Sequence, residues 1–402
     1  MENKKIIKVL FVVPVMNGIG GIQSSLINLM SNLGHDYDVY LCVIGNYIDE
    51  KTPIPDSVKI IKGSKLLEYA YVDYDKQKDK YGFFGKIMFA FTKIMKKVLG
   101  LQFLINTISK SFKVKGHFDA AIAFSNDIYR DGKLVMGGAN RIVEKSVSAD
   151  SKHGWIHNEA HREGLTKTIS KKTYKNFDTI VNVSYGCKAI FDSIIPDYKE
   201  KSKVAYNTFK KEEIIKKANS ETNPFSNDVF NIVTVARVDN TQKRIDKVIE
   251  CGQLLVENGL TEFKWYIVGD GPNMVELQES VKSKGLSSYI IFEGRKSNPF
   301  VYMKYADIMV MTSDYEAYPM VSKESMIVGT PVICTHFPSA NEVVDHQKNG
   351  LITGFDTADI FNAIKECMVN HDLLNDLSHY LKDNKVTNEK ALAQFNSIVN
   401  KG

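Results

Sequence analysis

The sequence predicts an α/β protein of two domains, each built around a doubly wound parallel β-sheet. The chain has 402 residues, which is more than one domain usually holds. Short continuous apolar runs recur along it, as in strands buried on both faces, and stretches of helical period separate them. Hydrophobic residues make up 44% and charged residues 25%, an ordinary composition for a protein with packed cores.

The first domain begins with a buried strand at 8–14 (KVLFVVP), followed by a loop at 15–21. Apolar residues then recur at helical spacing over 26–33, which predicts a helix with one buried stripe. Further buried strands are expected at 39–44, 118–125 and 179–184.

In the second domain the alternation of strand and helix becomes regular. A helix at 244–259 ends on a glycine, and a last helix at about 388–400 stands beyond the sheet. The predicted strands are 231–238, 263–269, 289–294, 307–313 and 331–335. Polar, Pro-containing composition around 205–228 marks the join. We therefore expect domains at 1–207 and 208–386, with a C-terminal helix at 387–402 that packs back toward the first domain.

Several features bear on location and partners. The charged N-terminus and apolar run imitate a signal peptide, but Lys8 interrupts the run and Pro14 closes it, which favours a strand. No apolar run is long enough to span a membrane. Five scattered cysteines without a C-x-x-C pair favour a reducing cytoplasm and no zinc site. Residues 1–205 carry 31 Lys+Arg and 21 Asp+Glu, which suggests an anionic partner, although no nucleic-acid motif occurs.

Two cations follow the first strand of the second domain. Arg237 ends the strand and Lys243 immediately precedes the next helix, so both are expected at the carboxyl edge of the sheet, where such folds bind ligands. Arg and Lys neutralise phosphate by charge-assisted hydrogen bonds. Spacing alone leaves two solvated surface cations as an equal alternative.

A second pattern lies in 313–333 (SDYEAYPMVSKESMIVGTPVI). Glu316 follows a strand by a short loop, and Glu324 stands one to two turns into a helix. The backbone N–H groups around Met320 and Val321 belong to that helix's first turn, a ready-made anion site. Carboxylates in these positions can accept hydrogen bonds from sugar and ribose hydroxyls. Taken alone, two such glutamates are more often ordinary acidic residues near the start of a helix, where the helix dipole favours them.

Together these segments resemble the large retaining glycosyltransferase family 4, of GT-B architecture, in which two Rossmann-like domains face a central cleft. The two glutamates match the family's E-x7-E signature. The resemblance runs over most of the chain through 183–209, 235–250, 267–272, 292–298 and 341–352. Two departures occur: FPSANE (337–342) lacks a Gly-Gly pair, and Lys-Arg at 243–244 replaces the more usual Lys-Gly.

The resemblance implies roles for individual residues. In the C-terminal, nucleotide-sugar-binding domain, Glu316 would contact the donor sugar and Glu324 the ribose, while Arg237 and Lys243 would bind the leaving diphosphate. In the N-terminal, acceptor-side domain, His157 would lie against the donor sugar. The other implied donor contacts are Gly20, Gly21, Gly269, Arg295, Met320 and Val321.

The implied function is transfer of a hexose or N-acetylhexosamine from a nucleotide-diphosphate sugar, with UDP the expected nucleotide, to a lipid-linked or polymer glycan acceptor of cell-surface polysaccharide. Anomeric configuration would be retained. We expect no cofactor and no metal, and read the D-x-D triplets at 36–38 and 73–75 as chance. The alternatives are a sugar-nucleotide epimerase-type enzyme and a catalytically silent glycosyltransferase-like partner subunit.

The segment between Gly82 and Gly116 is basic and amphipathic. It holds seven lysines and no acidic residue, and its apolar residues follow helical spacing over 84–98. This pattern fits a helix lying on an anionic membrane, with contacts from Lys86, Lys93, Lys96 and Lys97. It fits equally a domain helix whose apolar stripe is core. The membrane alternative places the protein on the inner face of the cell membrane.

Overall fold

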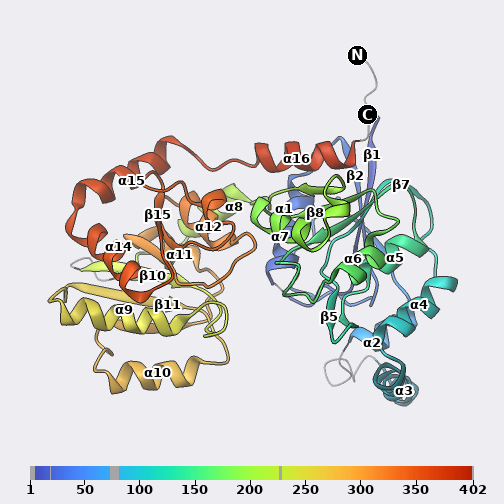
Figure 1. Cartoon of the computed structure of the whole chain (residues 1–402), viewed down its shortest axis with the longest axis horizontal. Coiled ribbons are helices and arrows are strands. Elements are labelled where there is room, and N and C mark those ends of the chain that lie inside the picture. The colour runs from blue at the N-terminus through green and yellow to red at the C-terminus, as the bar shows by residue number, and fades with distance from the viewer. Residues whose placement is uncertain (1–4, 19, 73–80, 226–228, 401–402) are drawn as a thin grey trace. The chain divides into compact units, whose positions relative to one another are not determined.

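The computed structural model describes residues 5–18, 20–72, 81–225 and 229–400 (Figure 1). The chain forms two compact units. Unit 1 comprises Met1–Phe209 with Asn388–Gly402, and unit 2 comprises Lys210–Thr387. Each is an α/β unit around one large parallel sheet, so the predicted fold class is confirmed. The expected join at 207/208 lies two residues before the join in the structure.

Unit 1 is built on a seven-stranded sheet of order β3-β2-β1-β4-β7-β8-β9 in which every pair is parallel. The chain order reverses between β1 and β4, the position at which such sheets bind ligands. Its strands are β1 Ile7–Val13, β2 Tyr37–Val43, β3 Lys59–Lys62, β4 His117–Ala123, β7 Ser148–Ile156, β8 Thr179–Asn182 and β9 Ser202–Val204. A small antiparallel hairpin, β5 Ile128–Arg130 with β6 Lys133–Met136, projects after β4.

The helices of unit 1 cover both faces of this sheet. They are α1 Gly21–Asn32, α2 Lys65–Tyr71, α3 Phe83–Leu99, α4 Leu101–Ser111, α5 Ala139–Ser146, α6 Lys167–Tyr174, α7 Tyr185–Ile194 and α16 Glu389–Val399. The strand β1 is buried from Val9 to Val13 without alternation, as expected for a central strand covered on both sides.

Unit 2 repeats the architecture with a six-stranded parallel sheet of order β12-β11-β10-β13-β14-β15. Its order reverses between β10 and β13. The strands are β10 Phe230–Val235, β11 Phe263–Val268, β12 Ile290–Gly294, β13 Ile308–Met311, β14 Val332–Thr335 and β15 Gly350–Thr353. The helices are α8 Lys211–Ala218, α9 Ile245–Glu257, α10 Met274–Ser283, α11 Phe300–Tyr305, α12 Met320–Ile327, α13 Ala340–Val343, α14 Thr357–Val369 and α15 His371–Asp383.

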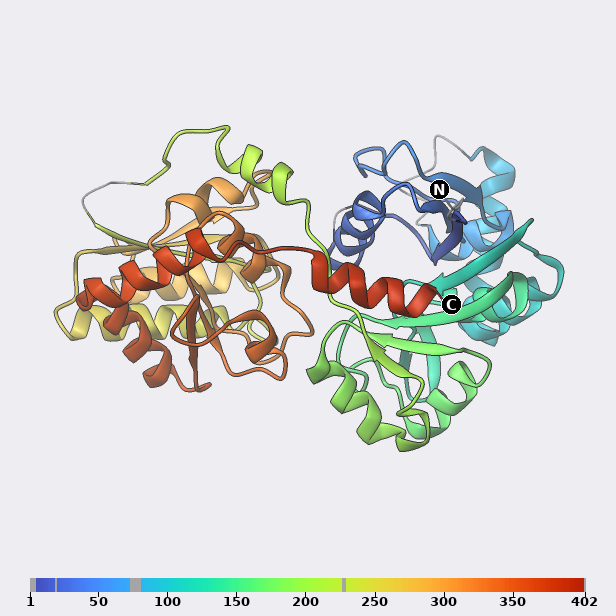
Figure 2. The ribbon, with the colours of Figure 1, turned by 90° about the horizontal axis from the view of Figure 1, so that it is seen from above.

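The last helix, α16, belongs to unit 1 although it follows all of unit 2 in the chain (Figures 1 and 2). The ring of Phe395 is 1% exposed and stacks on Phe11 of β1, with ring centroids 6.2 Å apart. It also lies 6.2 Å from the ring of Trp155 on β7. Asn388, just before the helix, donates its side-chain amide to the carbonyl of Phe209 at 2.8 Å. The helix therefore completes the core of unit 1.

Among the described elements, helix α3 packs mainly against α2 and α4, and it lies at the edge of unit 1 (Figure 1). Its inward side is formed by Gly85, Phe89 and Thr92. The apolar stripe noted in the sequence points the other way, with Phe84 73%, Ile94 61% and Val98 72% exposed. The alternative in which this stripe is core is therefore wrong. Across the described residues, every helix is too short or too polar to cross a membrane.

Candidate active site

The loop after β10 is organised by one aspartate. Asp239 is 2% exposed, and its Oδ1 accepts the backbone N–H groups of Gln242 at 2.8 Å and Lys243 at 3.3 Å. Its Oδ2 accepts from Nε of Arg237 at 2.6 Å. Burial opposes ionisation, but these hydrogen bonds together hold the pKa of Asp239 below its usual value. An ionised Asp239 thus fixes both predicted phosphate-binding cations on one loop.

Lys243 and Glu316 meet at the carboxyl edge of the sheet. The Lys243 ammonium group donates to Oε1 of Glu316, and both side chains are largely buried. Ser313 donates its hydroxyl to the same carboxylate at 2.8 Å. Because Lys243 follows β10 and Glu316 follows β13, this pair lies at the point where the strand order reverses. Lys243 and Glu316, which the sequence predicted as site residues although they are 73 positions apart, are therefore in direct contact.

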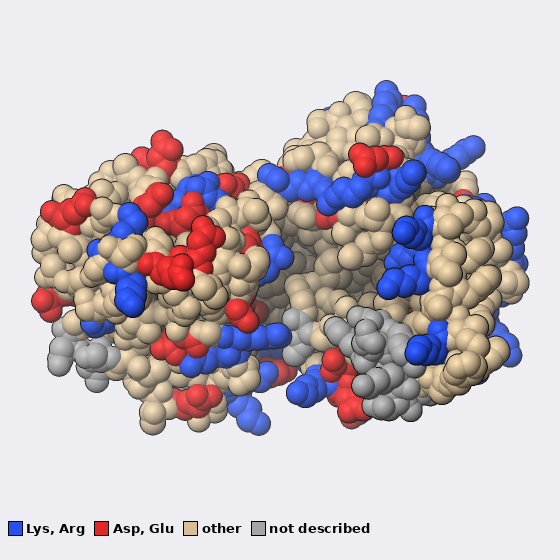
Figure 3. All heavy atoms as spheres, turned by 90° about the horizontal axis from the view of Figure 1, so that it is seen from below, with Lys and Arg blue, Asp and Glu red and all other residues tan. Residues whose placement is uncertain are grey.

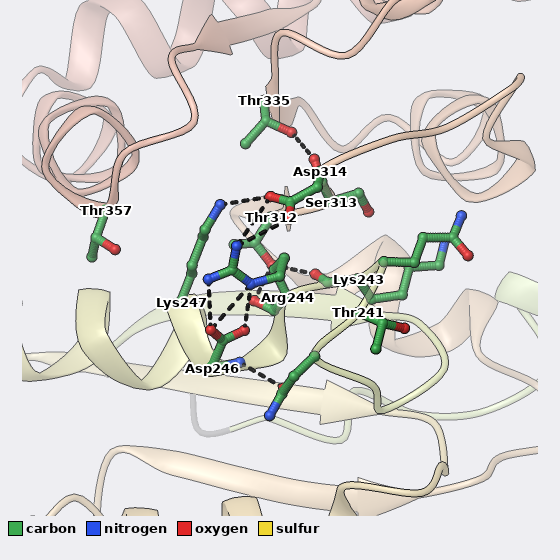
Figure 4. Close-up of polar contacts among 12 residues, drawn as sticks. Thr241, Lys243, Arg244, Asp246, Lys247, Thr312, Ser313, Asp314, Thr335 and Thr357 are labelled. Atoms are coloured by element: carbon green, nitrogen blue, oxygen red, sulfur yellow. Dashed lines mark hydrogen bonds and ion pairs between the residues drawn. The ribbon is translucent and has the colours of Figure 1, made fainter. Parts of the chain in front are cut away.

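Arg244 holds the backbone beside this pair in an uncommon conformation. It adopts φ 51° and ψ 50°, in the left-handed region that favours glycine. Its guanidinium group donates to Asp246 at 2.8 Å and to Asp314 at 3.0 Å, and Asp314 also accepts from Lys247 at 2.8 Å (Figure 4). The hydroxyl of Thr312 donates to the carbonyls of Lys243 and Arg244. This network ties the β10 loop to the end of β13.

Helix α12 begins at Met320 after Pro319, and no side chain caps it. The N–H groups of Met320 and Val321 lie in its first turn, where no intrahelical acceptor exists, so they are available to an anion. Glu324 is partly buried one turn further on. Burial raises the pKa of Glu324 to about 7, although the positive charge of Lys217 opposes the shift.

Two neighbouring loops complete this edge of unit 2. A Cβ on Gly269 would lie 1.8 Å from the carbonyl oxygen of Ala236, so only glycine allows the β11 loop to pack against the β10 loop. The N–H of Gly269 donates to the carbonyl of Gly294, directly before the exposed Arg295. Within the described residues, no hydrogen bond or ion pair joins Arg295 or Glu324 to the Lys243–Glu316 pair.

In unit 1, Gly20 and Gly21 open α1 directly after the β1 loop. Gly20 has an extended backbone, and a Cβ on Gly21 would meet nothing within 4 Å. A Cβ on Gly20 would lie 2.8 Å from Oε1 of Gln23, a flexible side chain that can move aside, so neither glycine is required by backbone strain. Open space at a helix N-terminus is what close approach of a ligand needs.

The structure separates the three histidines of 153–161. His153 is fully buried and hydrogen-bonded to Ser151, and His161 is half exposed beside Glu159. His157 directly follows β7, and its backbone N–H donates to Asn126 at 2.7 Å. Its Nε2 is buried and has no hydrogen-bond partner within the described part of the chain. Burial lowers the pKa of His157 to about 3, so the ring is neutral near pH 7.

In the first D-x-D triplet, Asp36 lies in the turn before β2, and Asp38, the second residue of β2, pairs with Lys59 at 2.7 Å. The second, at 73–75, lies outside the described residues.

Asp239 and Asp314 were not recognised from the sequence. An aspartate followed by polar residues between a strand and a helix (DNTQ, 239–242) is a usable signal for Asp239, since such side chains cap the following N–H groups. No local pattern marks Asp314.

The chain was compared with known proteins. Residues 215–384 match the family model described as "Glycosyl transferases group 1". N-acetyl-alpha-D-glucosaminyl L-malate synthase of Bacillus anthracis is 23% identical over 160 residues, 39% of this chain and 42% of that protein. Poly(ribitol-phosphate) alpha-N-acetylglucosaminyltransferase of Staphylococcus aureus is 28% identical over 134 residues, 33% of this chain and 27% of that protein. The matches thus span less than half the length of either relative.

A solved structure covers the chain more fully. HepE of Anabaena, crystallised with UDP, superposes with a TM-score of 0.66 over 98% of both chains at 16% identity. This likeness extends to both units and concerns the fold. The family model spans nearly all of unit 2, including the β10 loop, the Lys243–Glu316 pair and α12. Unit 2 is therefore similar to the glycosyl transferases group 1 family over residues 215–384.

Proposed function

We propose that this protein is a retaining glycosyltransferase that moves a hexose or N-acetylhexosamine from a UDP-sugar to an acceptor glycan of the bacterial cell surface. The observation that carries the proposal is the Lys243–Glu316 pair at the β10/β13 reversal, beside the N-terminus of α12. The names of the two sequence relatives, both of which describe transfer or synthesis with an N-acetylglucosaminyl group, support the same class.

The proposed chemistry follows from charge. Departure of a nucleoside diphosphate needs stabilisation of its developing negative charge. Arg237, Lys243 and the first-turn N–H groups of α12 are fixed donors that supply it, so we propose that no metal ion takes part. Glu316 is held by Lys243 and Ser313, which suits positioning of the donor sugar better than covalent attack. The leaving phosphate would then take the acceptor's proton.

The test is donor binding followed by turnover. Thermal shifts with UDP-, GDP- and ADP-sugars identify the donor, because a ligand selective for the native state stabilises it. Transfer to a bacterial envelope extract is then measured as released nucleoside diphosphate, with and without a chelator. We expect Lys243→Ala to lower turnover by about 10²- to 10³-fold. The matched control is Lys247→Ala, which removes a nearby lysine whose ammonium group pairs with the supporting Asp314 and lies over the ring of Phe355.

Undiminished turnover in the Lys243→Ala variant would show that the leaving group is stabilised elsewhere. Nucleotide release that needs no acceptor would point to hydrolysis. A product of inverted anomeric configuration, read from its proton coupling constants, would overturn retention.

We also propose that unit 1 binds the surface of an anionic membrane through α3. Lys86, Lys93 and Lys97 are exposed beside the exposed apolar stripe, and no acidic residue occurs between Gly82 and Gly116. In Figure 3 blue side chains border a tan surface on unit 1, at the right. Each lysine near an anionic leaflet contributes about 1 kcal/mol. Lys96 differs from its neighbours: it is partly buried and its Nζ donates to the carbonyl of Ala70 at 3.4 Å.

Liposome flotation tests this contact. The chain should float with vesicles that contain phosphatidylglycerol and remain below with neutral ones, and Lys86→Glu, Lys93→Glu and Lys97→Glu combined should abolish flotation. The triple variant Lys199→Glu, Lys201→Glu and Lys203→Glu, in unit 1 but remote from α3 in sequence, is the charge-matched control. Equal flotation of both triple variants would refute membrane docking by α3.

A further inference from the structure

A pocket of about 270 Å³ lies in unit 1 at the point where the strand order reverses. Its walls come from the β1 loop, the start of α1, the segment after β4 and the β5–β6 hairpin. Most lining side chains are apolar, among them Val13, Leu101, Phe124 and Val135. The pocket is thus suited to hold an apolar body rather than a sugar alone.

Two polar groups of this pocket have hydrogen bonds left to donate. Ser125 is 7% exposed, and its buried hydroxyl has no hydrogen-bond partner among the residues that the structure describes. Lys96, on the inner side of α3, is partly buried and has no carboxylate partner among the described residues. Burial lowers the pKa of Lys96, because a desolvated ammonium group lacks a compensating charge. An anion placed there would satisfy both groups.

The pocket shares part of its wall with a second, larger cavity of about 1130 Å³. Lys96, Leu101 and Val135 line both. Val98 and Leu99, at the C-terminal end of α3, line the larger cavity, but so do charged residues, among them Asp131, Lys133, Arg141 and Glu144. The larger cavity therefore suits polar groups, whereas an apolar chain is accommodated by the smaller pocket, which Lys96 of α3 also lines.

We infer that the acceptor is a membrane amphiphile whose phosphate binds Lys96 and Ser125 and whose apolar chain lies in the smaller pocket. The inference rests on the proposed function and names the acceptor's chemical class. Helix α3 then has two roles. Its outer side binds the bilayer surface, and Lys96 on its inner side binds the anionic group of a molecule that comes from the bilayer.

The probe is decyl phosphate below its critical micelle concentration, titrated into the full chain by calorimetry. We expect one site, with affinity that rises about fourfold per added methylene along the octyl-to-decyl series. Lys96→Met keeps the packed stem but removes the charge, and should weaken binding at least tenfold. Lys96→Arg should restore most of the affinity. Lys110→Met, an exposed lysine on α4, is the matched control and should bind like the original chain.

Three results would overturn the inference. Inorganic phosphate bound as tightly as decyl phosphate would identify a free-anion site. Decyl maltoside bound as tightly would identify an apolar pocket without charge recognition. Equal affinity of the Lys96→Met and Lys110→Met variants would remove Lys96 from the site. UDP binding is measured on the same samples: if UDP binds while decyl phosphate does not, only the acceptor class fails, whereas absence of UDP binding counts against the proposed function.

Discussion

Arg244 stands in a left-handed conformation where the related family more often has glycine. A non-glycine residue pays about 1–2 kcal/mol for this conformation. Partly exposed ion pairs such as those from Arg244 to Asp246 and Asp314 contribute about 0–1 kcal/mol each. The ion pairs therefore offset the strain. A glycine would leave the backbone next to Lys243 free to move, whereas the ion pairs of Arg244 hold it in place.

We expect Arg244→Gly to change the free energy of unfolding of unit 2 by less than about 1 kcal/mol, since it loses the ion pairs but also the strain. Arg244→Ala loses the pairs and keeps the strain, so it should be about 1 kcal/mol less stable than Arg244→Gly. Urea unfolding of the three proteins measures the order. An alanine variant as stable as the glycine variant would show that the left-handed conformation costs nothing here.

If Glu324 binds the donor's ribose as proposed, we expect donor binding to depend on pH. Its pKa of about 7 means that the carboxyl group is mostly protonated at pH 6 and mostly ionised at pH 8. An ionised carboxylate accepts two ribose hydroxyls, whereas the protonated form loses one acceptor. Affinity for the UDP-sugar of largest thermal shift should thus rise up to about tenfold from pH 6 to pH 8. Glu324→Gln should bind more weakly at pH 8 and show no such rise; an unchanged slope would assign the titration to another group.

At the scale of elements, α3 has one buried and one exposed aromatic residue two positions apart. Phe89 is 7% exposed and packs edge-on against Tyr69 at 4.9 Å, whereas Phe91 is 55% exposed. Phe89→Ser should cost about 3–4 kcal/mol of stability. Phe91→Ser should leave the melting temperature within a few degrees and weaken flotation with anionic vesicles. Comparable destabilisation by both would mean that the outer side of α3 is covered in solution.

The sequence predicted elements with long uninterrupted apolar runs and missed short or mixed ones. The predicted strand at 263–269 differs from β11 by one residue at one end. Strand β3 was missed because its KIIK is short and mostly exposed, and β7 because SADSKHG is polar until Trp155. For α3, periodicity identified an apolar stripe but not the side that faces the core, because the core side holds Gly85 and Thr92.

Residues of the candidate site could be predicted where their type and their position after a strand indicate a chemical role. Lys243, Glu316 and the start of α12 were found from their positions after strands. Asp314 and the conformation of Arg244 were not, because each depends on contacts about 70 residues apart in the chain. The role of Lys96 also needed the structure, since the sequence grouped it with Lys86, Lys93 and Lys97.

At the scale of the whole molecule, unit 1 depends on the last residues of the chain. Phe395 and Ile398 are buried in it, and burial of two such side chains contributes about 3–6 kcal/mol. Phe395→Ala should therefore lower the melting temperature of unit 1 and leave that of unit 2 unchanged. Trp155 reports on unit 1 in a Trp265→Phe background, and Trp265 on unit 2 in a Trp155→Phe background. An equal shift in both signals would show that the two units unfold as one.

The placement of α16 also sets the order in which the protein can be completed on the ribosome. Domains usually finish in the order of synthesis, the N-terminal one first. Here residues 210–387 form one unbroken segment and can fold as soon as they emerge, while the earlier-made strands must wait for Asn388 and the helix after it. Until α16 has been synthesised, the surface around Phe11 and Trp155 lacks its cover. The half of the molecule that is translated first is thus the half exposed longest to chaperones and to premature aggregation.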